Sequence, residues 1–203
     1  MTQVVSPSDK PITEGQAGKF YELFTTRLRK SEIGCIVAQR VLEEDGAALA
    51  EEMFMLIRKR VDARQGMIVR RVKPNRARSP QEMLDATNRR QYTDKAVVKA
   101  MPKGEGDEVD VVFFKVGRYI SDTDLDAEYE LRGLKPADPY SQAAVNEADP
   151  AFADEHPNGT HWKDKAGNWC FATFRRWFDE RSVNVFRLDF DWDGSWWFAG
   201  VRK

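Results

Sequence analysis

The only two histidines in the chain, His156 and His161, stand five residues apart among carboxylates. Asp154 precedes them and Asp164 follows them. Imidazole nitrogens and carboxylate oxygens can bind a transition metal, or place a general acid and a general base in one cleft. Their spacing is not that of a metal-binding helix, however, and the Pro-Asn-Gly run between them is typical of a turn. A structural role and a metal-dependent hydrolase both remain open.

A second group of carboxylates consists of Asp189, Asp191 and Asp193, followed by Gly194. Alternating aspartates before a glycine are typical of the start of a calcium-binding loop. The twelfth position, where such a loop needs a glutamate, is Gly200. A hairpin turn also explains the Asp-Gly pair. We therefore expect no cofactor, and the alternatives left open are calcium at this site and a transition metal at the histidines.

Opposite charges are separated along the chain although the formal net charge is only −1. Residues 57–103 contain fourteen Lys or Arg and four acids, whereas residues 104–159 contain four Lys or Arg and fourteen acids. The basic segment can neutralise phosphates of a nucleic acid or meet an acidic protein. It can also pair with the acidic block, within one chain or across a homodimer. The candidate contacts are Arg70, Arg71, Lys73, Arg76, Arg78, Arg89 and Arg90.

Five acids occupy alternate positions from Asp122 to Glu130, after a serine that can cap a helix. On a strand they would share one face, but on the capped helix that we expect over 122–132 they spread around the axis. We therefore interpret them as a solvated start of a helix.

Helical periodicity dominates the first third of the chain. We expect helices over 14–30, 31–44 and 47–64, the last two separated at Asp45-Gly46, with their apolar stripes facing a core. Shorter helices are expected over 80–88, 94–101, 140–147 and 150–155.

Alternating apolar residues predict strands over 67–72 and 109–120. Residues 168–201 carry five of the six tryptophans in period-2 runs separated by polar turns, which is typical of a three-stranded antiparallel meander. Its second face mixes aromatic and charged residues, so helices can cover it or single-stranded bases can stack on it. The fold class predicted is α+β: an amino-terminal helical layer packed on a mainly antiparallel sheet that ends in this Trp-rich meander.

Domain organisation and location follow from composition. We expect a flexible lead-in over 1–13 and one domain over 14–203, with a possible boundary near 102–107. No apolar run has the length of a bilayer span and the first residues are polar, so we expect a cytoplasmic protein without membrane contact. The two cysteines, Cys35 and Cys170, are expected to be reduced and mostly buried.

Three functions are consistent with these observations. The first is a non-catalytic binding module whose basic segment contacts nucleic acid or an acidic partner. The second is the metal-dependent hydrolase, and the third is a structural protein that self-associates through its opposite charge blocks.

Overall fold

The computed structural model describes residues 3–4, 12–187 and 191–203, which form helices and one large sheet. The predicted lead-in falls mostly outside the described residues. The strands are β1 (Gln3–Val4), β2 (Ile68–Val72), β3 (Arg90–Thr93), β4 (Val109–Lys115), β5 (Leu134–Pro136), β6 (Asn158–Lys163), β7 (Trp169–Trp177), β8 (Glu180–Arg187) and β9 (Trp197–Arg202). The helices are α1 (Glu14–Arg29), α2 (Cys35–Asp62), α3 (Pro80–Ala86), α4 (Lys95–Lys99), α5 (Asp122–Arg132), α6 (Pro139–Ala148) and α7 (Phe152–Glu155). The predicted α+β class, with an amino-terminal helical region and a mainly antiparallel sheet, is confirmed.

The chain divides into two compact units. Unit 1 comprises residues 1–5 and 64–203, and unit 2 comprises residues 6–63. The segment 102–107, proposed above as a possible boundary, lies inside unit 1. Arg76 holds it there, because its guanidinium donates to the carbonyl oxygens of Glu105 and Gly106 at 2.8 and 2.9 Å.

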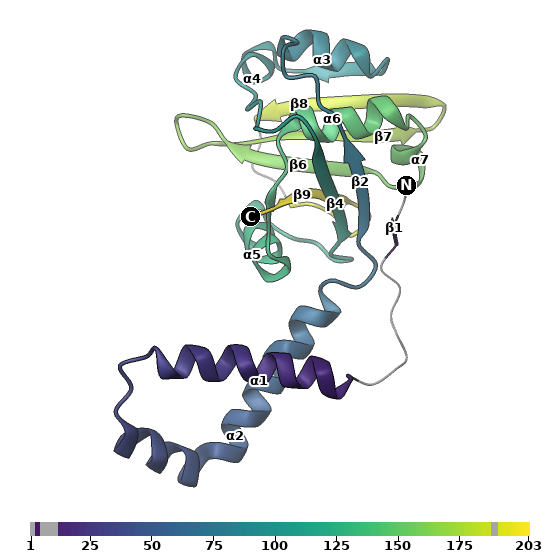
Figure 1. The fold of residues 1–203 in the computed structure, drawn as a ribbon. Coiled ribbons are helices and arrows are strands. Elements are labelled where there is room, and N and C mark those ends of the chain that lie inside the picture. The colour runs from purple at the N-terminus through teal and green to yellow at the C-terminus, as the bar shows by residue number, and fades with distance from the viewer. Residues whose placement is uncertain (1–2, 5–11, 188–190) are drawn as a thin grey trace. The chain divides into compact units, whose positions relative to one another are not determined.

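The sheet of unit 1 has the strand order β1-β2-β4-β9-β6-β7-β8-β3, with β5 paired to β9. Most neighbours are antiparallel, whereas β6 with β9 and β3 with β8 are parallel. Both faces are buried, as β4 shows: Val111 and Phe113 pack on one side and Val112 and Phe114 on the other. Helices α3, α4, α6 and α7 cover the first face, and α5 covers the second. Figure 1 shows α3 and α4 at the top of the sheet and α5 at the bottom.

The last strand does not complete a meander. Strands β7 and β8 form the expected hairpin, but β9 lies between β4 and β6 instead of beside β8. Trp192 pairs in an isolated bridge with Ile120 and leads the chain away from β8. The mixed face of the hairpin is covered in part: Phe174 and Val185 are buried among side chains of α3 and α4, whereas Phe178 is exposed.

Unit 2 consists of α1 and α2. Thr13 and Gln16 form a reciprocal capping box at the start of α1. Helix α2 is continuous through Asp45-Gly46, where a break was predicted, because a helix interior tolerates a glycine at a cost of only about 1 kcal/mol. Within unit 2, α1 and α2 do not bury their apolar stripes against each other: α1 has no buried residue, and sixteen of the large apolar side chains that remain exposed lie between Ile12 and Val61.

Two further observations concern the described residues. None of their helices combines the length and apolar composition that crossing a bilayer requires. Both cysteines are free, and Cys170 is buried as expected, whereas Cys35 is exposed at the start of α2.

Close packing of Gly159 against Trp192 predicts a stability effect. A Cβ at position 159 would lie 2.6 Å from the fully buried Trp192 ring. We expect Gly159→Ala to lower the free energy of unfolding of unit 1 by about 1–3 kcal/mol, because the overpacked ring must shift. Urea unfolding followed by tryptophan fluorescence measures this.

A double-mutant cycle supplies the control. The atoms nearest the added Cβ belong to the six-membered ring of the indole. In a Trp192→Phe background the alanine should therefore cost less, and an equal cost in both backgrounds would show that this contact is not responsible.

Candidate functional site

Helix α5 presents two aspartates on one face. Asp122 and Asp126 are four residues apart, which places them one turn apart on the same side of the helix. Ser121 caps the amino end by accepting from the Asp124 amide, and Gly133, with φ of 70°, ends the helix. Asp122 is 2% exposed, whereas the Asp126 side chain is 50% exposed. The pair therefore runs from the core of unit 1 toward its surface.

His161 lies between these two carboxylates. It stands on β6, where alternation directs Asn158, Thr160 and Trp162 to one face and His161 to the face that α5 covers. Its Nδ1 is 2.7 Å from Asp122 Oδ1, and its Nε2 is 3.0 Å from Asp126 Oδ1. The imidazole is 1% exposed. One buried ring thus joins the two acids of α5.

The two contacts of the imidazole differ in quality. The approach of Nδ1 to Asp122 is a hydrogen bond, but Nε2 makes none with good alignment among the described residues, although Asp126 is within ion-pair distance. Nε2 therefore retains the capacity to donate to another acceptor.

Asp122 is further held by the indole of Trp192, whose Nε1 donates to Oδ1 at 2.9 Å. Aromatic rings enclose the imidazole: Trp169 stacks on it at a centroid distance of 4.6 Å, and Tyr129 lies at 5.7 Å. These neighbours fix the orientation of the ring and exclude water from its Asp122 side.

The pKa of His161 is raised above its ordinary value. Burial alone would lower the pKa, since it disfavours the imidazolium, but Asp122 and Asp126 together outweigh burial. The two acids therefore favour the imidazolium form of His161. A titratable group with a shifted pKa at the wall of a cavity is a candidate for function.

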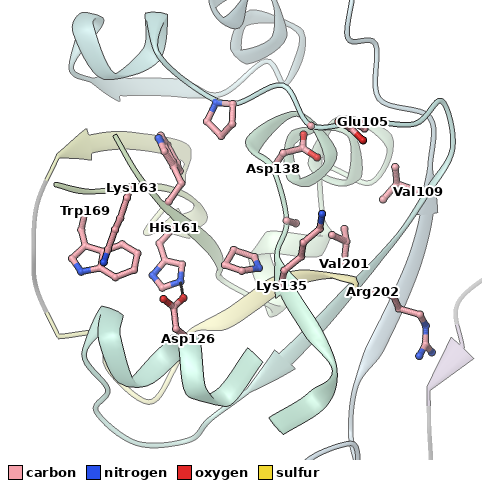
Figure 2. A pocket seen from close by; sticks show the side chains of 15 residues that line it. Glu105, Val109, Asp126, Lys135, Asp138, His161, Lys163, Trp169, Val201 and Arg202 are labelled. Atoms are coloured by element: carbon pink, nitrogen blue, oxygen red, sulfur yellow. Dashed lines mark ion pairs between the residues drawn. The ribbon is translucent and has the colours of Figure 1, made fainter. Parts of the chain in front are cut away.

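A cavity of about 670 Å³ opens beside Asp126 and His161. Figure 2 shows His161 with Lys163 and Trp169 on one side of it and Lys135 on the other. The far wall carries Glu105 and Asp138. The volume suits a small metabolite, and the lining combines cations, acids and indole rings.

The structure does not bring the two histidines together. His156 stacks on Phe152 and meets the edge of Trp197, on the sheet face opposite to that of Tyr129 and His161. Asp154 is occupied by Arg181, which donates at 2.6 Å and lowers the pKa of that carboxyl. The four side chains of the predicted hydrolase loop thus have separate surroundings.

Asp164 caps the turn between β6 and β7. Its carboxylate accepts from the backbone amides of Ala166 and Asn168 and pairs with Arg187 at 2.8 Å. Several contacts lower the pKa of Asp164, and the hydrogen bond from the Asn168 amide lowers it most. This arrangement explains Asp164 as a turn residue.

The predicted calcium site lies partly outside the described residues, because Asp189 is among those that the structure does not describe. Asp193 accepts from the amide of Ser195, as in a turn. Within the described part of the chain, no three His, Cys, Asp or Glu side chains gather closely enough to hold a metal ion.

The arginines of the basic segment largely meet acids of the acidic block. Arg71 pairs with Asp110, Arg76 with Asp138 and Arg78 with Glu147, at 2.7 to 2.9 Å. The other candidates divide by exposure: Arg70 lies over the Phe152 ring, Arg89 is buried and donates to the carbonyl oxygen of Pro150, and Lys73 and Arg90 are exposed.

Sequence reasoning missed the partnership of Asp122 with His161. Thirty-nine residues separate the two, and the Pro-Asn-Gly run before His161 resembles a turn although strand β6 begins there. The sequence did contain one signal of this partnership. Asp122 and Tyr129 lie on the same face of the helix, and an aromatic residue on a helix face indicates that the face packs on the core.

Comparison with protein-family models, with curated proteins and with solved structures gives no match for this chain. The assignment of function therefore depends on the geometry of the site.

The proton on His161 should make the stability of unit 1 depend on pH. Because its pKa is raised in the folded state, folding takes up a proton. This contribution to the free energy of unfolding is fully present below the unfolded pKa, about 6.5, and is lost as pH rises through the folded pKa. Asp126→Asn removes one carboxylate that raises the pKa of His161, so the contribution should be smaller and its loss should be complete at lower pH. Urea unfolding between about pH 5.5 and 9 measures both profiles.

Asp124→Asn is the matched control, because Asp124 lies on the exposed side of the same helix. Its pH profile should follow that of the unmodified protein in shape. If both variants shift the profile equally, the contact with Asp126 does not raise the pKa of His161.

Proposed function

We propose that unit 1 is a binding module for a small anionic molecule and that the cavity beside His161 is its site. The observation that supports this most directly is Nε2 of His161, a buried donor at the cavity wall without a well-aligned acceptor among the described residues. Asp126 Oδ1 already lies 3.0 Å from this nitrogen. An oxygen of a bound ligand would contact Nε2 by displacing the half-exposed Asp126 side chain.

Two lysines favour negative charge on the ligand. Lys135 and Lys163 are exposed at the cavity, and neither forms an ion pair within the described residues. Lys163 does approach the Trp169 ring, at 4.4 Å. On the far wall, Asp138 is neutralised by Arg76 at 2.9 Å. The positive charge of the two ammonium groups is thus available to a ligand.

Two acids in the lining define what else the ligand must carry. Asp126 and Glu105 are acceptors, so a ligand that is anionic throughout would meet repulsion. A phosphate or carboxylate that also carries hydroxyl or amino groups satisfies both kinds of contact. The proposed ligand class is therefore a small hydroxylated or amino-substituted anion.

Acid–base catalysis is the second candidate, and the contact between Asp126 and His161 favours it. An imidazolium whose pKa is raised can donate a proton, and a half-exposed carboxylate can accept one. Asp122 would act as the positioning residue, since it fixes the ring through Nδ1. This chemistry needs no metal ion and uses His161 without His156.

Ligand-observed NMR at low ionic strength tests the proposed site. The probes are inorganic phosphate, a sugar phosphate, an amino acid and the uncharged sugar. We expect the sugar phosphate or the amino acid to bind and the uncharged sugar not to bind. Lys135→Ala with Lys163→Ala should weaken binding at least about tenfold, because two charge-assisted contacts are lost.

Lys73→Ala with Lys95→Ala is the control, since both of these lysines are exposed and lie outside the cavity. Equal weakening in both double variants would mean that net charge, not the cavity, attracts the ligand. Any compound that binds is then incubated with the protein. A change in its spectrum that requires His161 would support the catalytic candidate.

The sequence also predicts that the basic segment contacts nucleic acid, and that prediction is untested. The three ion pairs with the acidic block favour the alternative, which is pairing within the chain. We expect labelled DNA and RNA, single- or double-stranded, to show no micromolar binding by anisotropy even at low salt. Binding of that strength that is lost in Lys73→Ala with Arg90→Ala would instead support the nucleic-acid function. Lys115→Ala, on β4 outside the segment, is the control.

A further inference from the structure

Unit 2 exposes more apolar surface than a stable pair of helices can leave in water. Leu42 and Leu56 of α2 are 59% and 56% exposed, and Phe20, Leu23 and Leu28 of α1 are also exposed. Isolated helices are marginally stable in water, and most helical stability in proteins comes from packing of an amphipathic face. The apolar faces of α1 and α2 therefore require a partner.

We propose that the partner is a second copy of this chain and that α2 pairs with α2 of that copy in antiparallel orientation. The spacing along α2 supports this. Leu42, Gly46, Leu49, Met53 and Leu56 are separated alternately by four and three residues, and Arg60, at the next step, ends the apolar run. This spacing keeps one stripe facing a neighbouring helix along its length.

When the two α2 helices run antiparallel with residue 51 opposite the partner's residue 51, the stripe of one helix fits the stripe of the other. In that register Leu49 faces the partner's Met53, and Gly46 faces the partner's Leu56, so a small residue meets a large one. Two-fold symmetry supplies each contact twice. Helix α2 has 28 residues, about 42 Å, so the whole stripe fits along one pair of helices.

Charge favours the same register. Asp45 lies at one edge of the stripe and Lys59 lies at the same edge, two heptads further on. Reversal brings Asp45 beside the partner's Lys59, again twice, which is an attractive pair of the kind that sets orientation in coiled coils. In a parallel pair Asp45 and the partner's Lys59 would lie about 21 Å apart along the axis, so this attraction would be lost. At the axis Glu52 meets the partner's Glu52, which offsets part of the gain.

Helix α1 adds a second apolar surface to each copy, and its Phe20 and Phe24 rings stack at 6.4 Å. Two copies supply four helices, the number of a common bundle architecture in which apolar faces meet in one core. This homodimer uses unit 2 alone, so it differs from pairing between the charge blocks of unit 1.

The mass of the full chain in solution, measured by light scattering over a range of concentrations, tests the proposal. We expect a dimer that Leu49→Asp with Leu56→Asp converts to a monomer. Met55→Asp, an exposed apolar position on the other side of α2, should leave the dimer intact. All six tryptophans lie in unit 1, so their fluorescence shows that unit 1 stays folded in each variant.

Charge reversal tests the orientation. Asp45→Lys and Lys59→Asp should each weaken the dimer by about three- to tenfold, because two attractive pairs become repulsive. An equal mixture of the two variants, or both changes in one chain, should restore it. A dimer that these changes do not affect would overturn the antiparallel register.

Two other outcomes would overturn the homodimer itself. One is a monomer at every concentration, and the other is a dimer that survives Leu49→Asp with Leu56→Asp. Sedimentation with vesicles of neutral and anionic lipid distinguishes a membrane surface as the occupant: a chain that binds vesicles as a monomer through the same leucines would contradict pairing with a second copy.

Discussion

The carboxylate of Asp122 is the constraint around which unit 1 is organised. A charged group buried in a protein interior costs several kcal/mol unless partners surround it. Asp122 meets this requirement through His161 on β6 and through Trp192, which precedes β9. Those two contacts fix α5 against β6 and against the segment that precedes β9. The same carboxylate stabilises the cation on His161, so the requirement that fixes the helix also fixes the chemistry of the cavity wall.

Opposite charges explain why a nearly neutral chain contains such uneven segments. Arg76 is the clearest case: it pairs with Asp138, which also caps α6, and it binds the carbonyl oxygens of the segment after α4. A guanidinium has several donors in a fixed plane, so one side chain can join three parts of the fold. Separation of charge along a sequence is therefore ambiguous by itself. It becomes an argument about external partners only for cations that have no acidic partner among the described residues, such as Lys135 and Lys163 at the cavity.

Local signals in the sequence predicted local structure well. The cap at Ser121 and the glycine at 133 define α5 at the predicted residues, and the capping box at Ser79 places α3 correctly. Long-range pairing was not predictable in the same way. Alternation identifies β9 as a strand, but nothing near Trp197 shows that the strand returns to the centre of the sheet between β4 and β6. The site depends on that pairing, because α5 meets His161 only after the sheet has assembled. His161 was therefore named as a candidate by itself, whereas Asp122 was interpreted as part of a solvated helix start, although it is 2% exposed.

Apolar periodicity also has a limit that the two units illustrate. The same pattern that buries Leu125 and Tyr129 of α5 against the sheet leaves Leu42 and Leu56 of α2 in water. Periodicity states that a helix has a face to cover, but it does not state whether the cover comes from the same chain. In unit 1 the sheet supplies it on both faces. In unit 2 the two helices do not cover each other, and a helix with an uncovered face of this size lacks the burial that offsets its conformational entropy. Helices in both units must therefore bury their apolar faces. The units differ in the source of the surface that covers those faces.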